Sequence, residues 1–136
     1  MGAGVSAANV ADKWLGVLKN TAFSGIANCY VQLHTNANTN AGPGAAGTAN
    51  VSVETTRKAV TWGTISGSAL PATSVASWTS WPSGANNETI SWVSVWDASS
   101  AGNFLFSGAL AVSKTVNTGD TLTLSTLSVG IGTLAS

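Results

Sequence analysis

The stretch Ile90-Ser91-Trp92-Val93-Ser94-Val95-Trp96 decides the fold, because it carries bulky side chains on both faces of an extended chain. Successive side chains of a β-strand point to opposite faces. Trp92 and Trp96 therefore share one face, and Val93 and Val95 share the other. This pattern predicts an inner strand that is covered on two sides.

Two further strands follow, each after a turn-forming sequence. Residues 97–103 contain Asp, Ser, Gly and Asn, which hydrogen-bond to nearby backbone or adopt positive φ. The next segment alternates from Phe104 onward, so the rings of Phe104 and Phe106 are expected on one face and small residues on the other. After a second turn, Leu122 and Leu124 share a face. Alternation this regular predicts antiparallel β-structure.

Residues 1–22 are predicted to form an N-terminal arm and helix, because the apolar spacing changes there to three and four. Trp14 and Leu18 recur on one helical face, and Ser6 or Asn9 can cap the start. An internal glycine weakens such a helix by about 1 kcal/mol relative to alanine, so the helix needs a surface to lie on. That surface is either the protein's own sandwich or another subunit, which makes Trp14 a candidate interface residue.

The other segments predict shorter strands and one long loop. Residues 26–34 and 58–62 alternate, residues 36–49 form a polar loop, and residues 63–84 show the poor periodicity of short strands. Leu124 and Leu127 differ in parity, so a bulge or bend is expected near residues 125–126. The sum is an all-β protein: one domain over residues 1–136, an antiparallel β-sandwich of jelly-roll type with one short N-terminal α-helix.

Composition and charge argue against several classes of partner. Charged residues make up 7% of the chain, with five basic and five acidic side chains and a net charge of zero. A nucleic-acid partner is not expected, because phosphate binding needs clustered Lys and Arg. Neither a membrane-spanning run nor a signal peptide is evident, so no membrane partner is expected. The single Cys29 can form no intramolecular disulfide and suits a reducing interior or assembly inside a cell.

The residues that could carry chemistry are sparse. His34 is the only histidine, and Cys29 lies on the opposite face of the same predicted strand. The acidic residues are dispersed, and Asp97 and Asp120 are expected to cap turns. Asn36, Asn38 and Asn40 have the spacing of a calcium loop without its charges. We therefore expect no catalytic centre, no cofactor and no metal site.

The six tryptophans are the main functional question. Trp62, Trp92 and Trp96 lie on alternating strands and are expected to pack against the sheets. Trp78 and Trp81 lie three apart in an irregular segment. Exposed aromatic residues of this kind indicate a protein interface or a sugar-stacking platform. The alternative is that both rings are tucked over the end of the sandwich.

The chain resembles a family of small tailed-phage virion proteins, common in actinobacterial phages and labelled tail-fibre-like or head-decoration proteins. The similar segments are Tyr30-Val31-Gln32-Leu33-His34-Thr35, Trp92-Val93-Ser94-Val95-Trp96-Asp97-Ala98, Gly102-Asn103-Phe104-Leu105-Phe106-Ser107-Gly108-Ala109-Leu110 and Val116-Asn117-Thr118-Gly119-Asp120-Thr121-Leu122. Arg57, which leads into Ala59-Val60-Thr61-Trp62, completes the resemblance. The family's usual Tyr and Gly ahead of this arginine are absent, and the usual proline after the His-Thr pair is delayed to Pro43.

The resemblance implies a non-enzymatic structural protein of the phage particle. The sequence has no repeats or heptads from which a fibre shaft is built, which favours a capsid decoration protein that binds the major capsid protein and stabilises the shell. A minor tail or tail-fibre protein is the alternative within this class, and a carbohydrate-binding module that uses Trp78 and Trp81 is the alternative from another class. A homo-oligomer, such as a trimer, is expected in either virion location, with Trp14, Trp78 and Trp81 as candidate partner-interface residues.

Overall fold

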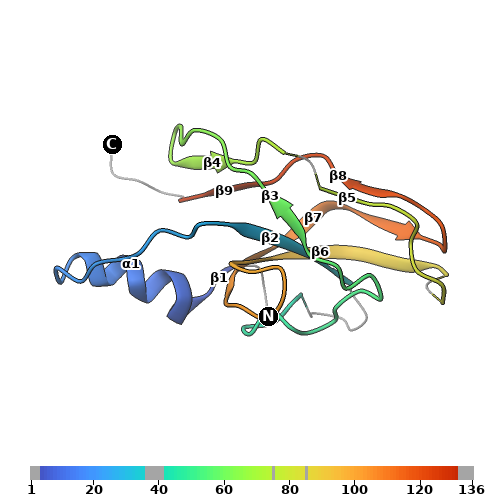
Figure 1. Cartoon of the computed structure of the whole chain (residues 1–136), viewed down its shortest axis with the longest axis horizontal. Coiled ribbons are helices and arrows are strands. Elements are labelled where there is room, and N and C mark those ends of the chain that lie inside the picture. The colour runs from blue at the N-terminus through green and yellow to red at the C-terminus, as the bar shows by residue number, and fades with distance from the viewer. Residues whose placement is uncertain (1–3, 36–41, 75, 85, 132–136) are drawn as a thin grey trace.

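The computed structural model describes residues 4–35, 42–74, 76–84 and 86–131, and the regular structure in these ranges consists mainly of antiparallel strands (Figure 1). The larger sheet has five strands in the order β1-β7-β6-β2-β3. These strands are β1 (Gly4–Val5), β2 (Cys29–Thr35), β3 (Lys58–Val60), β6 (Glu88–Trp96) and β7 (Phe104–Val116). Every pairing between them is antiparallel.

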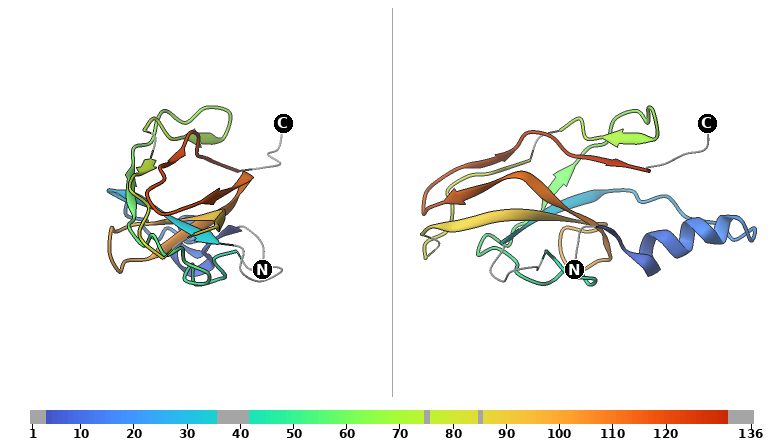
Figure 2. Two further views of the ribbon diagram at one scale, coloured as in Figure 1. Left: turned by 90° about the vertical axis from the view of Figure 1, so that its right-hand side faces the viewer. Right: turned by 180° about the vertical axis from the view of Figure 1, so that it is seen from behind.

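Two short ribbons form the second layer over one face of this sheet (Figure 2). In one ribbon β4 (Ala69–Pro71) pairs with β9 (Ser128–Gly130), and in the other β5 (Ala76–Trp78) pairs with β8 (Leu122–Leu124). Buried residues of both layers, including Val31, Leu33, Val93, Val95, Ala76 and Trp78, form one hydrophobic core. The prediction of an all-β antiparallel sandwich with one short helical segment is confirmed.

Strand β6 is covered on both faces, as its sequence predicted. Val93 and Val95 are 4% and 0% exposed and belong to the core between the layers. On the opposite face, Ser94 and Trp96 are 0% and 5% exposed, because the chain around residues 42–52 lies over them. The Gly47 backbone, for example, lies directly against the Trp96 ring.

The two phenylalanines at the start of β7 do not share a face, so that expectation was wrong. Phe104 pairs with Trp96 and Phe106 pairs with Val95, which leaves Leu105 as an extra residue between them. Neighbouring residues of β6 point to opposite faces, so their partners do as well. Phe104 accordingly packs edge-on against Trp96 at 5.7 Å between ring centroids. Phe106 packs against Trp62, on the side of the sheet that faces the core.

The predicted bend near residues 125–126 is confirmed, and it separates two strands. β8 ends at Leu124 and β9 begins at Ser128. Both Leu124 and Leu127 pack against the core although they differ in parity. The bend therefore keeps apolar side chains inward while the chain passes from its pairing with β5 to its pairing with β4.

The N-terminal arm is helical, but its helix is shorter than predicted. A π-helical turn (η1, Ala7–Ala11) leads into α1 (Asp12–Val17), and the Ser6 hydroxyl caps the start by accepting from the amide of Asn9 at 3.3 Å. The helix ends before residue 22, where Asn20 adopts a positive φ of 58°. Beyond η1 the arm extends past the end of the sandwich (Figure 1).

Candidate functional site

Trp78 and Trp81 lie inside the sandwich, so of the two alternatives the buried position is observed and the exposed aromatic platform is not. Their exposed fractions are 1% and 2%. The indole N–H of Trp78 donates to the carbonyl of Thr56 at 2.8 Å, and that of Trp81 donates to a carboxylate oxygen of Glu88 at 3.2 Å. With ring faces buried and both N–H groups satisfied, these residues offer neither a sugar-stacking surface nor a direct contact to a partner.

Trp14 is the predicted interface tryptophan that does lie at the surface. It is 43% exposed on α1, and three further apolar residues of the arm, Leu15, Val17 and Leu18, are exposed by 62%, 56% and 85%. Only Val10, in the preceding turn, is buried against the body of the protein. The interface role of Trp14 stays a prediction, but α1 presents an apolar surface that no described part of the chain covers.

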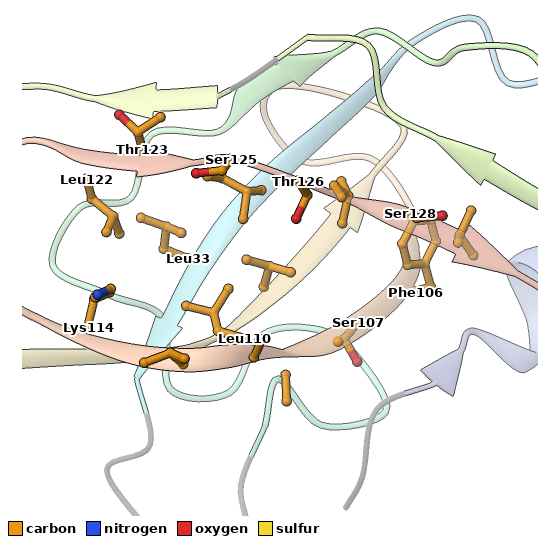
Figure 3. A pocket seen from close by; sticks show the side chains of 18 of the residues that line it. Leu33, Phe106, Ser107, Leu110, Lys114, Leu122, Thr123, Ser125, Thr126 and Ser128 are labelled. Atoms are coloured by element: carbon orange, nitrogen blue, oxygen red, sulfur yellow. The ribbon is translucent and has the colours of Figure 1, made fainter.

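An apolar groove of about 770 Å³ runs between β7 and the strand pair β8 and β9. Leu33, Leu110 and Leu122 point into it (Figure 3). Its floor reaches the core through Val93, and Val112, which is 66% exposed, stands at its rim. Sequence analysis did not identify this groove, because its walls come from segments that alternate like ordinary strands.

The groove exists because the sandwich is not closed along β7. β1 pairs with β7 only at Phe106 and Ser107, so the rest of β7 forms an outer edge of the sheet. Residues 110–113 of β7 bulge out opposite the single residue Ser91 of β6. On the other side, β8 pairs with β5 and not with β7. The two layers therefore separate here, and their inner apolar side chains stay accessible.

The polar groups closest to a catalytic arrangement are buried. Nδ1 of His34 lies 2.8 Å from the carbonyl oxygen of Ala49, and Nε2 lies 2.6 Å from the Ser94 hydroxyl. Because a carbonyl only accepts, Nδ1 carries the proton and the hydroxyl donates to Nε2. His34 and Ser94 are both 0% exposed, and burial lowers the pKa of the imidazole. This pair holds two strands and a loop together and does not meet solvent.

Three other sequence candidates occupy ordinary structural positions. Cys29 is buried, and burial raises the pKa of its thiol. Asp97 caps the β6–β7 turn as predicted, since its carboxylate accepts from the Asn103 amide at 2.7 Å. Asp120 likewise accepts from the Asn117 amide at 2.8 Å. The asparagines at 36, 38 and 40 lie outside the described residues.

The described ranges contain neither a candidate metal site nor a helix that could span a membrane. Within residues 4–35, 42–74, 76–84 and 86–131, no group of three or more His, Cys, Asp or Glu side chains could hold a metal ion. In the same part of the chain, no helix has the length and apolar character to cross a membrane. The groove and the exposed arm are therefore the surfaces from which a function can be argued.

The fold and these surfaces define a small β-sandwich protein with an open apolar groove. A family model described as Podophage GP4 fiber I protein gp80 matches residues 5–132, so the chain belongs to this family of phage fibre proteins. No curated protein matches the chain. The expected relationship to phage virion structural proteins, tail-fibre-like in kind, is thereby confirmed.

Proposed function

We propose that this chain is a non-enzymatic structural subunit of a phage fibre, held in the particle by contacts between apolar protein surfaces. The observation that carries the proposal is the pairing of an open apolar groove with an exposed apolar helix on one small sandwich. Exposed apolar patches rimmed by polar residues are typical of protein–protein interaction sites. The family's description as a fibre protein supports the fibre as the location.

The polar groups of the chain agree with a binding role. His34 and Ser94 lie at hydrogen-bond distance but are both fully buried. Enzyme sites place reactive groups in clefts that a substrate can enter. The groove, in contrast, has mainly aliphatic and hydroxyl side chains, and Lys114 is the charged residue among its lining.

Decoration of the capsid exterior is the second candidate within the same class. The sequence has no repeat or heptad series with which a subunit could build a shaft, and the observed body is a sandwich. A subunit of this shape could bind neighbouring copies of the major capsid protein and stabilise the assembled shell, because it would bind the shell and not its free subunits. Assembly in the host cytoplasm follows from either location.

Copy number in purified particles distinguishes the two locations. We expect quantitative mass spectrometry to find a handful of copies per particle, and immunogold labelling to place them on a fibre. Hundreds of copies and label over the head would establish the decoration role instead. Absence of the chain from intact, infectious particles would contradict both candidates.

A further inference from the structure

The exposed arm and the open groove are two apolar surfaces of opposite shape that no described residue of the chain covers. The arm is convex, with Trp14, Leu15, Val17 and Leu18 exposed by 43% to 85%. The groove is concave, about 770 Å³ in volume, and exposes side chains that continue into the core. The arm projects past the end of the sandwich and does not fold back over its own groove (Figure 2).

We propose that residues 12–18 of the arm of one copy dock into the groove of a second copy. This inference rests on the proposed structural role, and it names the partner of the groove as another molecule of the same chain. The contact is heterologous, since the arm of one copy meets the groove of the next. Repetition of such a contact produces a closed ring or an open filament of subunits.

The dimensions of the two surfaces are compatible. The edge of β7 that borders the groove runs from Phe106 to Lys114, which pair with Val95 and Ile90 of β6. These two β6 residues are five apart, so at ~3.3 Å per residue the edge is roughly 17 Å long. The helical part of the arm, Ala7–Val17, is about 16 Å long at ~1.5 Å per residue. The two lengths are similar, so the groove can hold the apolar turns of the helix.

The area of contact also favours exchange between copies. Four partly exposed apolar side chains offer on the order of 400 Å², about half of the ~800 Å² that each partner buries in a stable interface. In a heterologous assembly every interior copy makes two such contacts, one through its arm and one through its groove, so two contacts hold each copy in place. A closed assembly, in which every arm and every groove is filled, is therefore favoured over a pair that shares a single contact.

Charge does not oppose the association of identical copies. Five basic and five acidic residues give the chain a net charge of zero, so two copies approach without net repulsion. The groove side contributes a single cation, Lys114. The apolar residues of the arm consequently decide whether the two surfaces bind.

The test uses the full chain and two charge substitutions on highly exposed residues. Leu18→Asp changes a residue of the arm that is 85% exposed, and Val112→Asp changes a rim residue that is 66% exposed. Ile65→Asp is the matched control, because Ile65 is 69% exposed and lies outside both surfaces. Circular dichroism checks that each variant is folded before its mass is measured by light scattering after size exclusion.

We expect the parent protein and Ile65→Asp to be oligomeric, and Leu18→Asp and Val112→Asp each to be at least tenfold weaker in self-association. A mixture of the two weakened variants should associate more strongly than either variant alone, because one retains an intact groove and the other an intact arm. A monomeric parent protein, unchanged assembly of both variants, or a mixture that associates no more strongly than either variant alone would overturn the inference. A monomeric protein that is still found in particles would leave the proposed structural function standing.

Discussion

The Nε2 atom of His34 lies 2.6 Å from the Ser94 hydroxyl oxygen in a place that solvent does not reach. The same hydroxyl accepts a hydrogen bond from the indole N–H of Trp96 at 2.8 Å, while the other imidazole nitrogen donates to Ala49. This arrangement satisfies every polar atom of the group as long as the imidazole is neutral. Protonation would turn Nε2 into a donor and deprive the Ser94 proton of its acceptor.

Stability should therefore fall on mild acidification. Burial holds the pKa of His34 below its usual value in the folded protein, whereas the unfolded chain has a pKa of about 6.5. The unfolded state then binds more protons than the folded state, so the free energy of unfolding is highest above pH ~6.5 and decreases as the pH falls below it. Urea unfolding between about pH 7.5 and pH 5.5 measures this slope.

His34→Gln is the control for the pH effect, because glutamine does not titrate in this range. We expect the variant to be less stable at neutral pH, since it cannot reproduce both hydrogen bonds, and to show a clearly smaller dependence on pH. If parent and variant had the same slope, the proton uptake would belong to other groups.

The two buried tryptophans should dominate stability, and the exposed one should not. Trp78→Ala removes a fully buried ring together with its bond to the Thr56 carbonyl, and a loss of about 3–5 kcal/mol is expected. Trp78→Phe keeps most of the packing and should lose about 1–3 kcal/mol. Trp14→Ala, at a residue that is 43% exposed, should cost less than about 1 kcal/mol.

Thermal unfolding of the three tryptophan variants provides the measurement, with Trp78→Phe available if the alanine variant does not fold. An equal loss for Trp14→Ala and Trp78→Phe would contradict the assignment of Trp78 to the core and of Trp14 to the surface. Tryptophan fluorescence offers a second check, because the emission of a buried indole is shifted relative to that of an exposed one.

The local features of this fold could be predicted from sequence because their causes are local. Bulk on both faces identified β6 as an inner strand, and a change of parity located the bend between Leu124 and Leu127. The carboxylates of Asp97 and Asp120 cap turns whose composition marked them as turns. In each case a few consecutive residues contain the whole physical reason.

The features that sequence analysis missed depend on how distant segments meet. The extra residue Leu105 reverses the face of Phe104, but alternation alone does not reveal a bulge. Trp78 and Trp81 are buried by segments that pair only at three-residue strands, too short to show a period. The groove results from β7 and β8 pairing with different neighbours, which no single stretch of sequence encodes.

A glycine in the loop of residues 42–52, which lies over Ser94 and Trp96, should be nearly irreplaceable. Gly47 has a φ of +73°, and a Cβ atom there would overlap the Phe104 ring and lie 2.9 Å from the Trp96 ring. Gly47→Ala is expected to cost about 1–3 kcal/mol through backbone strain and overpacking. Gly25→Ala is the control, because a Cβ atom at Gly25 would meet nothing within 4 Å. Similar stability of both variants in urea would show that the loop moves away without cost.

Arg57 joins the β6–β7 turn to the sheet, and lysine should not replace it. Its guanidinium lies 3.8 Å from the centre of the Trp96 ring and donates to the carbonyls of Ala98 and Ala101 at 3.1 and 2.6 Å. A lysine ammonium has neither the planar fork nor the stacking surface, so Arg57→Lys should lose about 1–2 kcal/mol. Hydrogen exchange of residues 97–103 should accelerate in Arg57→Lys. The control is Lys19→Met, which removes an exposed cation of the arm and should leave the exchange of this turn unchanged. Equal protection of this turn in the parent protein and in Arg57→Lys would mean that the caps at Asp97 hold it without the arginine.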